Sequence, residues 1–189
     1  MALSRRSWLG ALAGAGSLAA ETVGFKADTG PARSECGVGA LLPWADSLWA
    51  VTYNSHKSRT GTGLALYRID DDLKVEKVHV HDGTHANRFV HKESNTAFIG
   101  PYAIDMGGRW RFIEALRDIR ITATFAHLKD RANLVYMLGM EGELFEVDVA
   151  TLKARQVEDV LKVLGGKRRP HFKGAFTGQG RVVVANNGF

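Results

Sequence analysis

Cysteine is almost absent from this chain: Cys36 is the only one among 189 residues. A disulfide within the chain is therefore excluded, and we expect packing alone to hold the fold together. The sequence also has no cysteine cluster and no H-E-x-x-H motif, and His79 and His81 form only an isolated H-x-H pair. We therefore expect no metal site.

Signatures of nucleotide binding and of hydrolase chemistry are missing as well. Two G-x-G runs, at 61–63 and 178–180, have no following helix that could hold a phosphate, and no G-x-S-x-G motif occurs. We therefore expect no cofactor. The formal net charge of +5 is too small to predict nucleic-acid binding, so no nucleic-acid partner is expected.

The first twenty residues have the layout of an export signal. Arg5 and Arg6 precede an uncharged apolar run at 8–20, which is too short to span a bilayer as a helix. The stretch S-R-R-S-W-L at 4–9 resembles the twin-arginine signal, with Trp8 in the usual place of Phe. We therefore predict a cleaved twin-arginine signal peptide at 1–20 and a linker at 21–35. The mature protein would be periplasmic or extracellular and free of the membrane.

Short β-branched, aromatic and aliphatic runs bounded by Gly, Asp and Asn recur after residue 36. Four of these runs can be overlaid on one another, at 48–53, 97–102, 134–139 and 181–186. A third strand ends three times at an aspartate, which we expect to close the turn into a fourth strand: Asp70, Asp105 and Asp148. Four antiparallel strands in about 35 to 50 residues form the blade of a β-propeller.

The sequence therefore predicts an all-β fold at 36–189, an incomplete β-propeller of four-stranded antiparallel blades with about three and a half blades present. The blades are expected at about 36–81, 84–115, 120–160 and 170–189. Ring closure needs at least about four blades. We therefore expect the N-terminal piece of a larger ring, either because the chain is truncated or because another chain completes it. The run at 157–166 predicts one or two helical turns after the third blade.

In a propeller, the loops leading into the inner strands share one face with the loops joining the second and third strands. The predicted blades place a set rich in His, Arg, Lys and Asn on this face, the mouth, with Glu141 as its only carboxylate. Such a mouth favours an anionic ligand. The catalytic candidates are Tyr53, His56, His85 and His171. The substrate-binding candidates are Asn54, Lys57, Arg88, Arg169 and Lys173.

Several of these histidines and cations also have a structural or solvated alternative. His56 and Lys57 lie in a Gly- and Thr-rich loop, and Arg169 follows two glycines, so all three are compatible with ordinary surface positions. His171 begins an inner strand, where a structural role is equally compatible with the pattern. At the opposite ends of inner strands, structural roles are favoured for His91 and His127. On an outer strand, exposure is expected for His79 and His81.

Four runs, at 35–39 (E-C-G-V-G), 54–57 (N-S-H-K), 86–89 (A-N-R-F) and 171–174 (H-F-K-G), resemble secreted bacterial propeller proteins that include ulvan lyases. The resemblance implies a seven-bladed ring that acts on an acidic, sulfated polysaccharide. It also implies β-elimination, in which a positive group neutralises the uronate carboxylate, a base removes the neighbouring proton and an acid assists the leaving oxygen. In that family His, Tyr and Arg fill these roles.

A non-catalytic exported propeller that binds a glycan, a peptide or a partner protein is the alternative function. The fold alone does not choose between an enzyme and a binding protein, because propellers host both. A quinone- or metal-dependent oxidoreductase is a third class that uses the same export route. The sequence offers no ligand constellation for it.

Overall fold

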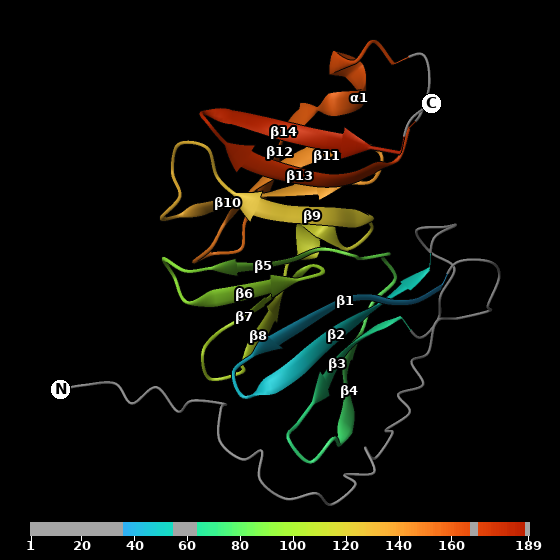
Figure 1. Cartoon of the computed structure of the whole chain (residues 1–189), viewed down its shortest axis with the longest axis vertical. Helices are drawn as coiled ribbons and strands as arrows, with labels where there is room; N and C mark the ends of the chain where they lie inside the picture. The colour runs from blue at the N-terminus through green and yellow to red at the C-terminus, as the bar shows by residue number, and fades with distance from the viewer. Residues whose placement is uncertain (1–35, 55–63, 167–169, 188–189) are drawn as a thin grey trace, which may run out of the picture.

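The computed structural model describes residues 36–54, 64–166 and 170–187. The predicted signal peptide and linker lie outside the described residues and stay predictions. The described residues form fourteen strands in three four-stranded sheets and one two-stranded sheet. The sheets follow one another in chain order, from the blue and cyan sheet at the bottom of Figure 1 to the red one near its top.

Each four-stranded sheet is an antiparallel meander whose strands lie in sequence order. Blade 1 consists of β1 (Cys36–Trp44), β2 (Ser47–Asn54), β3 (Ala65–Ile69) and β4 (Val75–Val80). Blade 2 consists of β5 (Arg88–His91), β6 (Thr96–Ile99), β7 (Tyr102–Ile104) and β8 (Trp110–Phe112). Blade 3 consists of β9 (Ile121–Ala126), β10 (Leu134–Gly139), β11 (Glu143–Asp148) and β12 (Ala154–Asp159). Blade 4 has two strands, β13 (Phe172–Gly178) and β14 (Arg181–Asn186).

This repetition of meanders confirms the predicted all-β propeller with about three and a half blades. Two short helical segments join blades: η1 (Glu114–Leu116) follows blade 2, and α1 (Val160–Val163) follows blade 3, where a short helix was expected. Asp159 caps α1, because its side chain accepts a hydrogen bond from the backbone N–H of Lys162. Among the described residues, no helix has the length and apolar character needed to cross a bilayer.

The repeated aspartates close the turns between the third and fourth strands, as the sequence predicted. The Oδ1 atom of Asp148 accepts hydrogen bonds from the backbone N–H groups of Ala150 and Thr151. Asp70 and Asp105 accept equivalent bonds from backbone N–H groups two and four residues further along the chain. These backbone hydrogen bonds hold the pKa of Asp105 and of Asp148 below the usual range. The aspartates therefore have the structural role expected of them.

Replacing Asp148 by alanine is expected to lower the free energy of unfolding by about 1 kcal/mol, because the turn loses its side-chain acceptor. Urea denaturation followed by circular dichroism measures the change. Asp148→Asn keeps a carbonyl acceptor and should lose less. Equal stability of the native chain and both variants would show that the turn does not need this acceptor.

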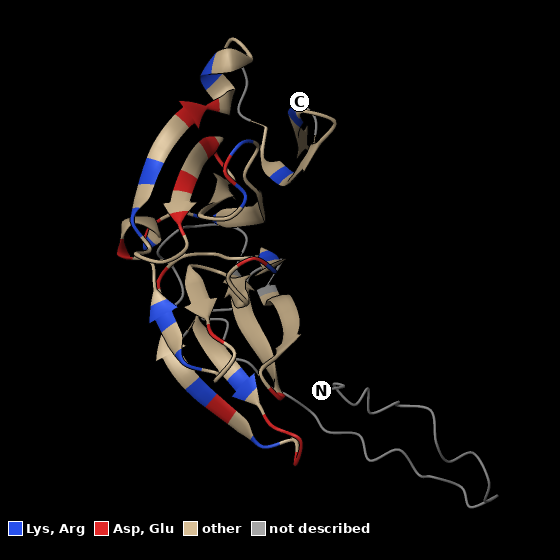
Figure 2. Ribbon diagram, turned by 90° about the vertical axis from the view of Figure 1, so that its left-hand side faces the viewer, with Lys and Arg blue, Asp and Glu red and all other residues tan. Residues whose placement is uncertain are grey.

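Hydrophobic cores lie between consecutive blades, because each blade presents apolar side chains on both faces. On the face toward the following blade, one directly opposed pair from the inner and second strands enters each core. These pairs are Leu42 with Trp49 in blade 1, Phe89 with Phe98 in blade 2 and Phe125 with Tyr136 in blade 3. Charged residues gather on the outer strands and turns in Figure 2, whereas β1 and β9 contain none.

Polar contacts also tie each blade to the next. The Trp44 indole N–H donates to the backbone oxygens of Ile104 and Asp105, which joins blade 1 to the β7–β8 turn. The Arg111 guanidinium donates to the backbone oxygens of Val149 and Ala150 and joins blade 2 to blade 3. Together with the cores, these bonds make the relative position of the blades specific.

The two inner-strand histidines have the structural roles expected of them. His91 lies with Nε2 2.6 Å from the backbone oxygen of Arg131, which connects blade 2 to the β9–β10 turn. The Nδ1 atom of His127 accepts from the backbone N–H of Asp130, and its Nε2 is 3.0 Å from a Glu146 carboxylate oxygen. Both rings are buried and fully engaged, and so they serve the fold.

The expected exposure of His79 and His81 is wrong. His81 is buried and His79 is half-buried, because the end of β4 faces the aromatic side chains of blade 2. The Nδ1 atoms of the two histidines lie 3.0 and 2.8 Å from the hydroxyl oxygen of Tyr102. Position on an outer strand therefore did not imply contact with solvent, since the neighbouring blade covers this part of β4.

Candidate functional site

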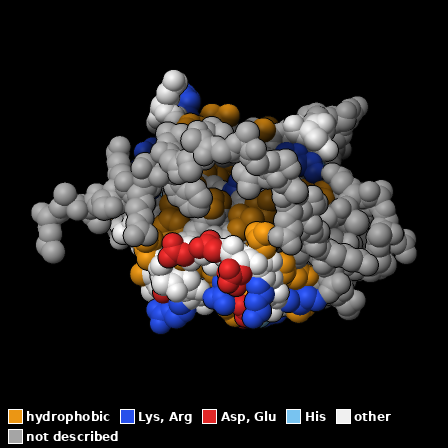
Figure 3. Space-filling model, turned by 60° about the horizontal axis from the view of Figure 1, so that its bottom comes forward, with side chains coloured by type: hydrophobic (Ala, Val, Ile, Leu, Met, Phe, Trp, Pro, Cys, Tyr) orange, Lys and Arg blue, Asp and Glu red, His pale blue; other side chains and the backbone are white. Residues whose placement is uncertain are grey.

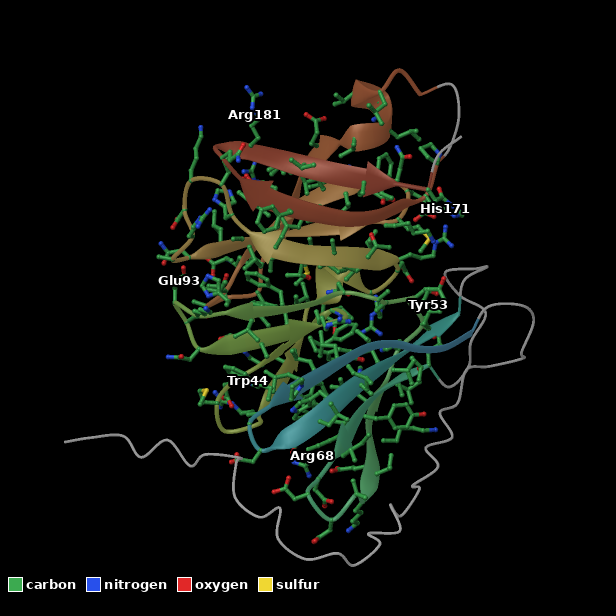
Figure 4. All side chains as sticks on the ribbon, viewed as in Figure 1. Trp44, Tyr53, Arg68, Glu93, His171 and Arg181 are labelled. Carbon is green, nitrogen blue, oxygen red and sulfur yellow. The ribbon has the colours of Figure 1, made fainter. Side chains whose placement is uncertain are left out.

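A pocket of about 350 Å³ opens on the mouth. It combines residues of β1 and β2, the loop before β5, the start of β9 and the loop after β10, and β13. Its lining residues are Val38, Gly39, Tyr53, Ala86, Thr122, Met140 and Lys173. In Figure 4, Tyr53 and His171 lie at the same edge of the molecule, whereas Glu93 and Arg181 lie at the opposite edge. The pocket is therefore on the face that the blade pattern assigned to ligands.

Two of the predicted site residues line this pocket. Tyr53 is half-buried near the end of β2, and Lys173 is exposed in β13. Arg88 is exposed at the first position of β5 but does not line the pocket. His56, Lys57 and Arg169 lie outside the described residues. Asn54 is the last residue of β2, and its side chain is also outside the described part.

His85 is fully buried, with 0% of its surface exposed, and is not at the surface of the mouth as expected. The sequence places it in a loop before an inner strand, but Gly39, Gly83 and Gly100 let the neighbouring segments come close. A Cβ atom at Gly39 would overlap the backbone oxygen of His85, and one at Gly83 would lie 2.6 Å from Cε1 of its ring. His85 therefore lies beneath the pocket.

The cationic groups of the mouth differ in how far their charge is balanced. Arg120 is buried and forms an ion pair with Glu141, the single carboxylate expected on the mouth. Its Nη2 atom is also 3.5 Å from Nε2 of His171. Within the described ranges, no hydrogen bond or ion pair engages the Lys173 amino group. Lys173 is therefore the cation in the pocket lining that is available to an incoming anion.

Backbone hydrogen bonds fix the positions of the segments that contain these charged side chains. The Met140 N–H donates to the Arg120 oxygen, and the Phe172 N–H donates to the Met140 oxygen. The His171 N–H donates to the side-chain oxygen of Asn187, which links the start of β13 to the segment after β14. The positions of His171 and Lys173 relative to blade 3 are thus determined by the backbone.

Glu143 is a titratable group that sequence reasoning did not select. Its Oε2 atom is buried and has no hydrogen-bond partner among the described residues. Burial raises the pKa of this carboxyl, and the nearby negative charges of Glu141 and Asp159 raise it further. No sequence signal marks it, because a glutamate at the start of an alternating strand is usually exposed.

Val38, Gly39 and Ala86 line the pocket but were not among the candidates either. Gly39 had a usable signal, because a glycine inside a strand often marks a close backbone approach. It lies at the bulge between Val38 and Ala40 in β1. Apolar residues such as Val38 carry no chemical signal, so only the fold could assign them to a ligand pocket.

Under the mouth, a chain of buried polar rings extends from blade 2 to the loop before β5. The rings of His81 and His85 are 4.7 Å apart in an edge-to-face arrangement, and Tyr102 contacts His81 from the other side. Burial lowers the pKa of His81 to about 4 and lowers that of His85 well below its usual value. In the described part of the chain, no group of three His, Cys, Asp or Glu residues could hold a metal ion.

The sequence matches no model of a known protein family and no curated protein. Among solved structures, the chain is similar to the β-propeller domain of Cps50 (Swd1) from Myceliophteria thermophila, with 11% sequence identity and a TM-score of 0.45. The match covers 80% of this chain and 48% of the solved chain, so this chain spans about half the length of that one. The likeness concerns the fold alone.

Proposed function

We propose that the pocket binds an anionic ligand and that this ligand is a segment of an acidic polysaccharide. The observation that carries the proposal is the position of Lys173, an exposed cation in the lining of a pocket at the mouth. Its ammonium group can pair with a uronate carboxylate or a sulfate, and the Tyr53 hydroxyl can hydrogen-bond to the sugar. The twin-arginine-like N-terminus supports an exported protein that meets such polymers outside the cytoplasm.

Within this proposal, β-elimination of a uronate is the reaction that the resemblance to ulvan lyases suggests. A base would take the proton from the carbon beside the carboxylate, a carbon–carbon double bond would form, and the bond to the leaving sugar oxygen would break as that oxygen takes up a proton. Tyr53 and His171 are the acid and base candidates at the mouth edge. Non-catalytic binding is the alternative, and the burial of His85 favours it because one candidate acid or base is inaccessible.

Calorimetric titration of the chain with sulfated uronate oligosaccharides tests the binding. Lys173→Ala is expected to weaken binding by about tenfold, the effect of losing one charge-assisted contact, while Lys173→Arg should retain most of the affinity. Lys92→Ala, in the exposed β5–β6 turn, is the matched control and should bind normally. Equal affinities of Lys173→Ala and the native chain would contradict the proposed site.

The same samples distinguish catalysis from binding. A rise in ultraviolet absorbance from an unsaturated uronate product, lost in Tyr53→Phe or His171→Ala, supports the lyase reading. Binding without any rise, across several uronate polymers, excludes it and leaves the non-catalytic alternative.

A further inference from the structure

The ion pair between Arg120 and Glu141 differs from the other Arg and Lys ion pairs of the described residues. The Arg120 side chain is 11% exposed, whereas the basic side chains of the other pairs are between 44% and 83% exposed. Figure 3 shows the ordinary arrangement at the blade 1 end of the molecule, where acidic and basic side chains lie next to each other at the surface. A buried cation depends on a neighbouring anion more than an exposed one does. Arg120 therefore needs a partner anion at all times.

Glu141 is a partner that another anion can replace. Its side chain is 44% exposed and belongs to the turn between β10 and β11. The backbone of this turn is fixed, because the Gly142 N–H donates to the Gly139 oxygen and the Val160 N–H donates to the Gly142 oxygen. The carboxylate can therefore leave Arg120 by rotation of its own side chain. It enters water at little cost, because it is already half-exposed.

Glu143 is another carboxyl close to this turn, and it also interacts with the charge of Arg120. Its Oε2 atom is buried and has no hydrogen-bond partner among the described residues, and a Cβ at Gly139 would overlap it. Glu143 is thus held against the backbone of β10 and does not pair with Arg120 through this atom. Glu141 is the carboxylate that forms the ion pair.

The ion pair lies at the edge of the pocket. Glu141 directly follows Met140, a lining residue whose N–H donates to the Arg120 oxygen. On its other side, the Nη2 atom of Arg120 is 3.5 Å from Nε2 of His171, two residues before Lys173 in the chain. Lys173 is the available cation in the pocket lining. One ligand can therefore reach both Lys173 and the place that the Glu141 carboxylate occupies.

We propose that Glu141 occupies the position of a second acidic group of the ligand. One acidic group of the ligand pairs with Lys173, and the second displaces Glu141 and pairs with Arg120. The inference rests on the proposed function, because it assigns a further subsite for the same acidic polysaccharide. A guanidinium can hold a carboxylate or a sulfate through two parallel hydrogen bonds. Because Glu141 competes for Arg120, the pocket selects a segment with two closely spaced acidic groups over one with an isolated acidic group.

Calorimetric titration with sulfated uronate oligosaccharides tests the competition. Glu141→Gln should bind about tenfold more tightly than the native chain, because the ligand no longer competes with a carboxylate for Arg120. Glu93→Gln is the matched control, because it changes the net charge equally at the opposite edge of the molecule (Figure 4), and it should bind as the native chain does. If Lys173→Ala weakens binding but Glu141→Gln does not tighten it, this inference is overturned and the proposed function stands.

A double variant shows whether the gain requires Arg120. The chain with Arg120→Gln and Glu141→Gln has a neutral pair in place of the ion pair, and circular dichroism checks that it is folded. It should bind no more tightly than the native chain, because the second acidic group has lost its partner. A gain that persists in the double variant would come from the loss of a negative charge alone and would overturn the inference.

Titration with inorganic sulfate separates the subsite from the choice of polysaccharide. In the Lys173→Ala background, adding Glu141→Gln should tighten sulfate binding about tenfold, because it frees Arg120 to pair with the ion. Tighter sulfate binding without any binding of oligosaccharides would contradict the polysaccharide and support the Arg120 subsite. Equal sulfate binding with and without Glu141→Gln would overturn the subsite.

Discussion

Substitution of Gly39 by alanine is expected to destabilise the chain by about 3 kcal/mol, the upper range for overpacking a core. The added Cβ would overlap the backbone oxygen of His85 and lie 2.9 Å from the Cβ of Tyr53. Neither neighbour can rotate away as a flexible side chain could, because one is backbone and the other is the base of a side chain. Blade 1 would therefore have to move away from the loop before β5.

Chemical denaturation measures the stability of Gly39→Ala, and Gly174→Ala is the matched control. Gly174 is also in an inner strand, but a Cβ there meets no atom within 4 Å, so its substitution should change stability by less than about 0.5 kcal/mol. Because Gly39 lines the pocket, ligand binding should fall in the same variant. A Gly39→Ala chain as stable as Gly174→Ala would show that blade 1 and the His85 loop are not in close contact.

Acidification from pH 7 to pH 5 is expected to destabilise the chain through the buried histidines. In the folded chain, burial lowers the pKa of His81 to about 4 and lowers the pKa of His85 well below its usual value. Their stabilising contribution is complete above the unfolded pKa of about 6.5 and is lost as the pH falls below it. His81 should cost roughly 2 kcal/mol between pH 7 and pH 5, and His85 changes stability in the same direction.

Between pH 7 and pH 5, the carboxylates affect the free energy of unfolding differently from the histidines. The hydrogen-bonded aspartates, whose pKa values are lowered, affect stability only at more acidic pH, near and below about 4. Glu143 acts in the opposite direction, because its raised pKa lets the folded chain take up a proton earlier than the unfolded chain. The histidine contribution is therefore best isolated by substitution.

The substitution His85→Leu isolates the contribution of this histidine to the pH dependence of stability. Neither ring nitrogen of His85 has a hydrogen-bond partner among the described residues, so leucine should fill the site without the loss of a bond. The difference in unfolding free energy between pH 7 and pH 5 should shrink in this variant, because leucine cannot take up a proton. Ile99→Val, in a neighbouring part of the core, should lose about 1 kcal/mol at both pH values. An unchanged pH dependence in His85→Leu would show that His85 does not stay neutral in the folded chain.

The strands and turns could be predicted from the sequence because they depend on interactions between residues that are close along the chain. Alternating side chains predict the strands, and an aspartate that bonds backbone N–H groups two and four residues ahead predicts a turn wherever it occurs. Asp70 and Asp105 behave in this way, and Asp148 bonds the backbone N–H groups two and three residues ahead. In blade 2, Tyr102 ends the run predicted at 97–102, whereas in the structure it begins β7 after the short Gly100–Pro101 connection.

The candidate site could be predicted only in part from the same local sequence patterns. Tyr53 and Lys173 could be predicted as pocket residues. The order of the strands is enough to bring the end of β2 and the start of β13 to one face of the propeller. The pairing of Arg120 with Glu141 was not predicted, because it joins two loops that only the fold brings together. Burial could not be derived for His81 or His85, since a loop or an outer strand is exposed unless another blade covers it.

The sequence by itself determined the strands, their grouping into four-stranded units, the aspartate turns and the face on which ligand groups gather. Each of these depends on interactions within a few residues or on the alternation of one strand. Only the tertiary structure decided which polar groups are accessible and which charges are paired. Those properties depend on what a neighbouring blade covers, and that neighbour is tens of residues away along the chain.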